Sequence, residues 1–149
     1  MRMSIVLILI IIISVISYNA FRVPNSVSGI NTGGTTLVVN QSSSQTKQLH
    51  YLIKQVLEKN SSALSELINF NCGGGSGCYD LGYFLTQIVY QMGEDEFVIM
   101  ASELNSVDKR MLLDFIRAGL EYGYGYDYSE VDKLGIETAF PSLYAGLKD

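Results

Sequence analysis

Apolar residues recur at helical spacing along most of the chain after Thr46, and the most regular segment follows Asp80. Six apolar residues repeat there every three or four positions: Leu81, Phe84, Leu85, Ile88, Val89 and Met92. This spacing places them on one face of an α-helix. Asp80 stands where a helix N-cap is expected, and Gly93 stands where a glycine commonly ends a helix. The pattern therefore predicts a helix from about Leu81 to Met92.

Similar apolar stripes predict helices on both sides of this segment. They begin near Thr46, after Ser61 or Ser62, at the acidic turn Glu94-Asp95-Glu96, and after Asn105-Ser106, with a further short helix or two near Pro141. No segment long enough for a sheet shows the alternation typical of strands. We therefore expect an all-α domain of five or six short helices. Its predicted core consists of Phe84, Leu85, Ile88, Phe97, Leu112, Phe115 and Ile116.

Residues 1–21 have the composition of a targeting segment. Arg2 and the amino terminus provide positive charge, and residues 5–16 are almost entirely aliphatic. One interpretation is a signal peptide cleaved after Ser17. The other is an uncleaved anchor from Met3 to Phe21, close to the roughly 20 residues that cross a bilayer. Both interpretations place the rest of the chain outside the cytosol, either tethered to the membrane or secreted.

Residues 22–45 differ in composition from the rest, because they are rich in Ser, Thr, Asn and Gly and carry no charge after Arg22. Such a segment buries little apolar surface, so we expect a flexible tether between the targeting segment and the folded domain of residues 46–149. Asn40 and Asn60 each begin a sequon for N-glycosylation. That signal applies only in a eukaryotic secretory pathway.

The two cysteines, Cys72 and Cys78, flank a loop made almost entirely of glycine. In an exported chain, two cysteines close in sequence predict a disulfide. A glycine-rich loop before a helix can also bind anions, but the lysine and serine or threonine of a phosphate-binding loop are missing. The cysteine spacing does not match a zinc site, and the sequence predicts neither a metal nor a cofactor.

The charge of the chain and its candidate catalytic residues narrow the classes of function that the sequence supports. The chain has a formal net charge of −5, and its Lys and Arg residues are scattered, which argues against nucleic-acid binding. His50 is the only histidine. It is the candidate base if the protein is a small extracytoplasmic hydrolase or ligand-binding protein that uses nearby carboxylates. The acidic turn at Glu94 is more typical of a helix N-terminus than of a cation site. No catalytic motif is present, so we expect a protein without enzymatic activity.

Tyrosines give the strongest indication of function. Four of them alternate with glycine or aspartate after Glu121, namely Tyr122, Tyr124, Tyr126 and Tyr128. Tyr83 and Tyr90 are seven residues apart on the predicted central helix. Tyrosine with glycine and serine is typical of recognition surfaces, although the rings can equally fold back over a small core. We therefore predict that these six tyrosines contact a protein partner, and that the protein is an interaction module of the cell envelope or surface.

Overall fold

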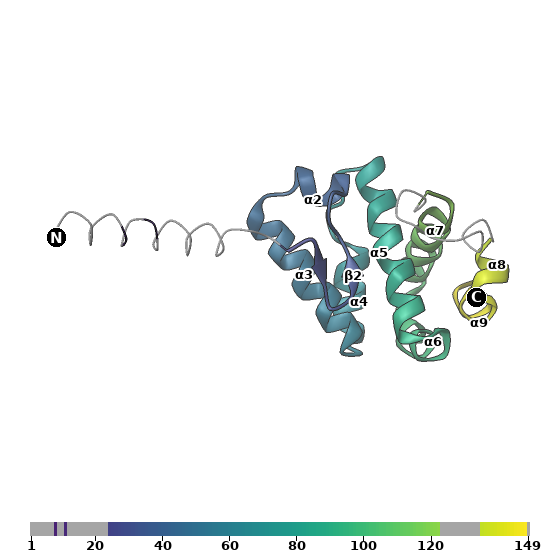
Figure 1. Cartoon of the computed structure of the whole chain (residues 1–149). Coiled ribbons are helices and arrows are strands. Elements are labelled where there is room, and N and C mark those ends of the chain that lie inside the picture. Colours follow the sequence, from purple (N-terminus) through teal and green to yellow (C-terminus); the bar gives the residue numbers. More distant parts are fainter. Residues whose placement is uncertain (1–7, 9–10, 12–23, 123–134, 149) are drawn as a thin grey trace.

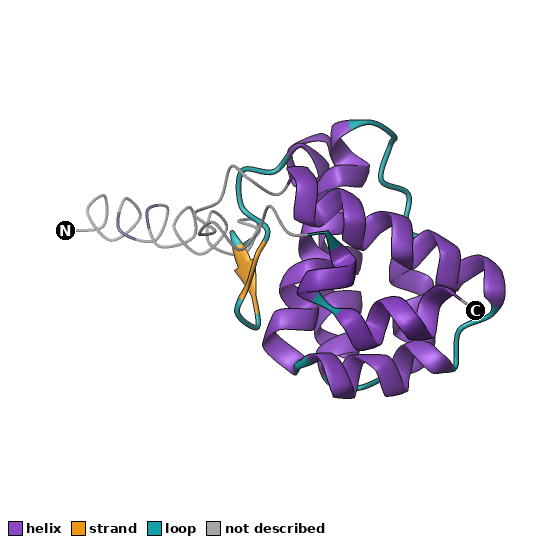
Figure 2. Cartoon of the chain, turned by 90° about the vertical axis from the view of Figure 1, so that its right-hand side faces the viewer, coloured by secondary structure: helices purple, strands orange, loops and turns teal. Residues whose placement is uncertain are grey.

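The computed structural model describes residues 8, 11, 24–122 and 135–148, and within these ranges the protein is mostly helical (Figures 1 and 2). The prediction of an all-α fold is therefore confirmed. In chain order the elements are β1 (Ser26–Val27), β2 (Ile30–Asn31), α2 (Thr36–Asn40), α3 (Ser43–Leu57), α4 (Ser61–Ile68), α5 (Ser76–Met92), α6 (Glu94–Ser102), α7 (Ser106–Tyr122), α8 (Ile136–Ala139) and α9 (Pro141–Lys148).

Helix α5 is the central element of the fold. Strand β2 and helices α2 and α3 contact it from one side, while α7 packs along it from the other side (Figure 1). Every residue from 81 to 89 is buried, including Tyr83, Thr86 and Gln87. The apolar face predicted from the sequence is therefore correct, but the helix has no solvent-facing side over these residues. The Gln87 side chain bonds to the backbone of Asn31 in β2, and the Thr86 hydroxyl donates to the Gly82 carbonyl within α5 itself.

The predicted core is largely confirmed. Six of the seven predicted residues are fully buried, namely Phe84, Leu85, Ile88, Phe97, Leu112 and Ile116. Phe115 is the exception, because it is only partly buried at the edge of this cluster. Its backbone carbonyl oxygen lies against Gly82 of α5, and the residue lines a surface groove between α5 and α7.

Residues 24–45 are folded, so the prediction of a flexible tether is wrong for this part of the segment. Ile30 and Leu37 are each 1% exposed and belong to the main core. The strands β1 and β2 form an antiparallel hairpin, and Gln87 of α5 bonds to both backbone groups of Asn31, at 2.8 and 3.1 Å. Two buried aliphatic side chains and these paired polar groups offset the entropy of ordering a segment that carries no charge.

Several helix ends are determined by capping residues that lie close to them in the sequence. Ser42 and Gln45 form a capping box at the start of α3, a few residues before the predicted start. Asn60 caps α4, in place of the predicted Ser61 or Ser62. Asn105 accepts bonds from two backbone amides in the first turn of α7, each at 2.9 Å. Gly93 ends α5 as predicted.

The targeting segment predicted for residues 1–21 lies outside the described residues, apart from Ile8 and Ile11. Within the described part of the chain, no helix has both the length and the hydropathy that spanning a membrane requires.

Candidate functional site

An apolar groove lies between the first turn of α5 and the outer side of α7. Its volume is about 310 Å³, and its lining residues are Cys78, Tyr79, Met111, Asp114, Phe115 and Ala118. The apolar α7 residues of this groove are at positions 111, 115 and 118, and position 122 continues the same stripe. This i, i+4, i+7, i+11 spacing gives α7 a second apolar stripe beside its core-facing side.

Two tyrosine rings stack at the end of this groove. The ring centroids of Tyr79 and Tyr122 are 4.6 Å apart, with an angle of 25° between the ring planes. Tyr79 is 44% exposed and Tyr122 is 53% exposed. In a stack each ring covers one face of the other, so the exposed area belongs to the outer faces and edges. The pair thus presents a large aromatic surface to solvent.

Helices α5 and α7, which line the groove, approach each other closely at two glycines. A Cβ atom on Gly82 would overlap the backbone carbonyl oxygen of Phe115. A Cβ atom on Gly119 would overlap the Gly82 carbonyl and the Thr86 hydroxyl, and that hydroxyl donates a 2.9 Å hydrogen bond to the Gly82 carbonyl. This backbone contact brings Tyr79, three residues before Gly82, next to Tyr122, three residues after Gly119.

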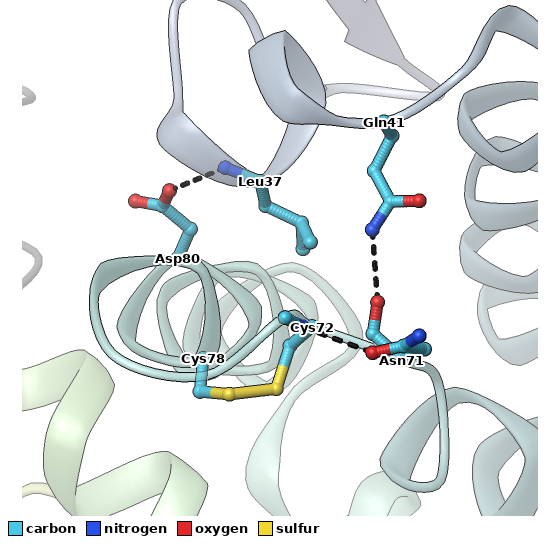
Figure 3. The surroundings of a disulfide bond; sticks show 7 residues. Leu37, Gln41, Asn71, Cys72, Cys78 and Asp80 are labelled. Atoms are coloured by element: carbon cyan, nitrogen blue, oxygen red, sulfur yellow. Dashed lines mark hydrogen bonds between the residues drawn. A yellow bond between two sulfur atoms is a disulfide. The ribbon is translucent and has the colours of Figure 1, made fainter.

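The Cys72–Cys78 disulfide fixes the start of α5 beside the groove (Figure 3). The predicted disulfide is therefore present, with its Cα atoms 4.9 Å apart. Glycines 73 to 75 all have positive φ angles, from 53° to 81°, which side chains rarely tolerate. The glycine run thus lets the chain turn tightly, and the disulfide holds that turn in place.

Asp80 does not cap α5, because the helix already begins at Ser76. Its carboxylate instead accepts a 2.9 Å hydrogen bond from the backbone amide of Leu37 and so caps the short helix α2 (Figure 3). Burial raises the pKa of Asp80, and the bonds from the Leu37 and Thr36 amides act in the opposite direction. A second bond between the same regions joins the Gln41 side chain to the Asn71 carbonyl oxygen at 2.8 Å. Both bonds attach the 24–45 segment to the disulfide region.

Acidic groups lie at the solvent side of the groove. The side chain of Asp114 lines it and is 78% exposed. Glu121, which is also exposed, forms a hydrogen bond with the Tyr122 hydroxyl that raises the pKa of Tyr122. Arg117 is 3.8 Å from Asp114, but its guanidinium also lies 3.5 Å from Glu137 and 5.8 Å from the centre of the Tyr144 ring. No lysine or arginine lines the groove in the part of the chain that is described.

The structure brings together only part of the predicted tyrosine surface. Tyr124, Tyr126 and Tyr128 lie outside the described residues. Tyr83 is 3% exposed, so the prediction that it contacts a partner is wrong. Its position on α5 is covered because that helix is buried all round.

Tyr90 is 41% exposed, but it lies near the far end of α5 from Tyr79, with its ring centroid 4.8 Å from that of Phe140. It does not join the groove. Sequence reasoning missed Tyr79, Met111 and Phe115 as members of the surface. The repeat of apolar residues at 111, 115, 118 and 122, offset from the core stripe of the same helix, is the signal that could have found them.

His50 has a structural environment. It is 8% exposed, and its Nε2 atom is hydrogen-bonded to the Thr32 hydroxyl at 2.9 Å. Burial lowers the pKa of His50. No hydrogen bond joins this imidazole to a carboxylate in the described ranges. Nor do those ranges contain a group of three His, Cys, Asp or Glu side chains that could hold a metal ion.

Comparison with known proteins gives no match to a protein-family model, to a curated protein sequence or to a solved structure.

Proposed function

We propose that the protein is a non-enzymatic interaction module of the cell envelope or surface, and that the groove with the Tyr79–Tyr122 pair is its contact surface for another protein. The observation that carries the proposal is the stacked pair itself. Two aromatic rings, each about half exposed, lie beside an apolar groove on the α5–α7 helix pair. Central tyrosines often supply much of the binding energy of an interface because they bury large areas with few rotatable bonds.

Two further features support the location outside the cytosol. The aliphatic segment near the amino terminus has the composition of a signal or an anchor. A disulfide is also typical of proteins that fold in an oxidising compartment. Helix α7 and the β1–β2 hairpin lie on different sides of α5 (Figure 1). A chain tethered through its N-terminal side would therefore present α7, which supplies most of the groove lining, away from the tether.

Affinity capture from the envelope fraction of the native host tests this function. The full chain is compared with the double variant Tyr79→Ser/Tyr122→Ser and with Tyr51→Ser. Tyr51 is a matched control because it is 60% exposed on α3 and does not line the groove. We expect a captured protein with the parent chain and the control that is lost with the double variant, while all three melt at similar temperatures. Equal capture by all three would contradict the proposal.

A further inference from the structure

The chemistry of the groove defines what kind of protein segment it can bind. We infer that the groove binds a segment in which an arginine or lysine is flanked by aliphatic residues. This inference rests on the function proposed above and adds the chemical class of the partner. It follows from three properties of the surface: the exposed ring faces, the acidic edge and the apolar floor.

The first property is the exposed face of each tyrosine ring. The face of a tyrosine ring attracts a cation placed within about 6 Å of its centre, and arginine is used most often. The same chain uses this contact at another site, where Arg117 and Lys148 lie 5.8 and 5.5 Å from the centre of the Tyr144 ring. Among the described residues, no cation lies over Tyr79 or Tyr122. Tyr79 is 44% exposed and Tyr122 is 53% exposed, so these rings offer surface on which a cation from another molecule could stack.

The acidic edge adds a second attraction for positive charge. Asp114 and Glu121 are about two helical turns apart on α7, and both are solvent-exposed along the outer side of the stripe that ends at Tyr122. Arg117 offsets part of this charge, but it is also engaged by Glu137 and Tyr144. A guanidinium stacked on Tyr122 would lie close to Glu121, so the ring and the carboxylate favour the same ligand group. A negatively charged segment would be repelled by the same two carboxylates.

The floor of the groove selects the residues beside that cation. Met111, Phe115 and Ala118 provide apolar surface, and the flexible methionine adapts to aliphatic side chains of different shapes. The groove volume of about 310 Å³ suits a few side chains of a peptide and is too small for a folded domain. The expected ligand is therefore a short protein segment that places Arg or Lys over the tyrosines and Leu, Ile or Met in the groove.

Selection from a random 12-residue peptide library on the immobilised full chain tests the inference. Enriched peptides are then synthesised, and their affinities are measured by fluorescence anisotropy. We expect enriched sequences with Arg or Lys next to aliphatic residues. Their affinity should fall about three- to tenfold for Asp114→Asn/Glu121→Gln, which removes the acidic edge but keeps the shape. It should be lost for Tyr79→Ser/Tyr122→Ser, and kept for Tyr51→Ser and for Tyr79→Phe/Tyr122→Phe, which retains both ring faces.

The other outcomes of the selection distinguish failure of this inference from failure of the proposed function. Enrichment of neutral or acidic peptides, or equal affinity for the parent chain and Asp114→Asn/Glu121→Gln, overturns the inferred chemistry. If such neutral peptides still require Tyr79 and Tyr122, the groove remains a contact surface and the proposed function stands. The absence of any enriched peptide overturns the inference as well, and the capture experiment above then decides on the function separately. Circular dichroism of every variant checks that the fold is retained.

Discussion

Replacing Gly119 with alanine should destabilise the protein by forcing α5 and α7 apart. The added methyl group would overlap the Gly82 backbone and the Thr86 hydroxyl, and the backbone cannot rotate away as a long side chain can. Overpacking of this kind costs about 1–3 kcal/mol, and the upper end applies where the clash is with backbone. Alanine recovers at most about 1 kcal/mol through its higher helix propensity. The net loss is about 2 kcal/mol, or roughly 5–10 °C in melting temperature for a domain of this size.

Gly146→Ala is the matched control for this substitution. Gly146 lies in α9, where an added Cβ atom would meet only a methyl group of Val98 at 3.9 Å, which is ordinary contact. There the propensity term acts alone, so the free energy of unfolding should rise by up to about 1 kcal/mol. Both variants are measured by thermal unfolding followed by circular dichroism. A melting temperature of Gly119→Ala equal to or above that of the parent chain would refute the close glycine contact.

Three further predictions concern the disulfide, a buried carboxylate and the N-terminal segment. Replacing Cys72 and Cys78 with serine should cost about 2 kcal/mol, measured by urea unfolding, and equal stability would show that the clip is dispensable. Asp108 is 5% exposed, and the hydrogen bond that it accepts from Ser65 lowers its pKa. The ionised carboxylate therefore stabilises the folded state at neutral pH, and this contribution is lost as the pH falls below about 4. Asp108→Asn should therefore reduce stability at pH 7 by about 1–3 kcal/mol and flatten the acid limb of the stability–pH curve; an unchanged curve would contradict this role. Deleting residues 24–45 should lower the melting temperature of the folded domain, because it would expose the core around Ile30 and Leu37. Equal melting temperatures for a domain that starts at residue 46 and one that starts at residue 24 would contradict this prediction.

The helices were predictable because their signals are local. Capping side chains, apolar stripes and a terminal glycine lie within a few residues of each helix end that they determine. Gly93 and the acidic first turn of α6 are examples, and the core stripe of α5 is another. The disulfide was predictable for the same reason, since six positions separate its two cysteines.

The remaining features depend on contacts between residues far apart in the sequence. Asp80 has the local appearance of a cap for α5, but it caps α2, 43 positions away. The 24–45 segment has the composition of a linker, yet Asn31 and Gln87 pair across 56 positions. Composition cannot distinguish a free polar segment from one whose polar groups find distant partners.

The sequence predicted an exposed tyrosine surface, but it identified only some of the residues that form it. Tyr122 does belong to an exposed aromatic surface, whereas Tyr83 is buried and Tyr90 lies elsewhere on α5. The partner ring, Tyr79, is brought to Tyr122 by the crossing at Gly82 and Gly119. Helical periodicity gives the face on which a residue lies, but it does not give the neighbour that covers that face, so Tyr83 and Tyr79 could not be distinguished from sequence alone.

Site-specific photo-cross-linking tests the central claim most directly, because it reports what touches the groove in the native host. A photoreactive phenylalanine replaces Tyr122 in one version of the full chain and Tyr51, on the opposite side of α5, in another. We predict a discrete cross-linked protein from position 122, identifiable by mass spectrometry, and none from position 51. Cross-linking at position 122 that is absent, or no more specific than at position 51, would contradict the assignment of the groove as the contact surface.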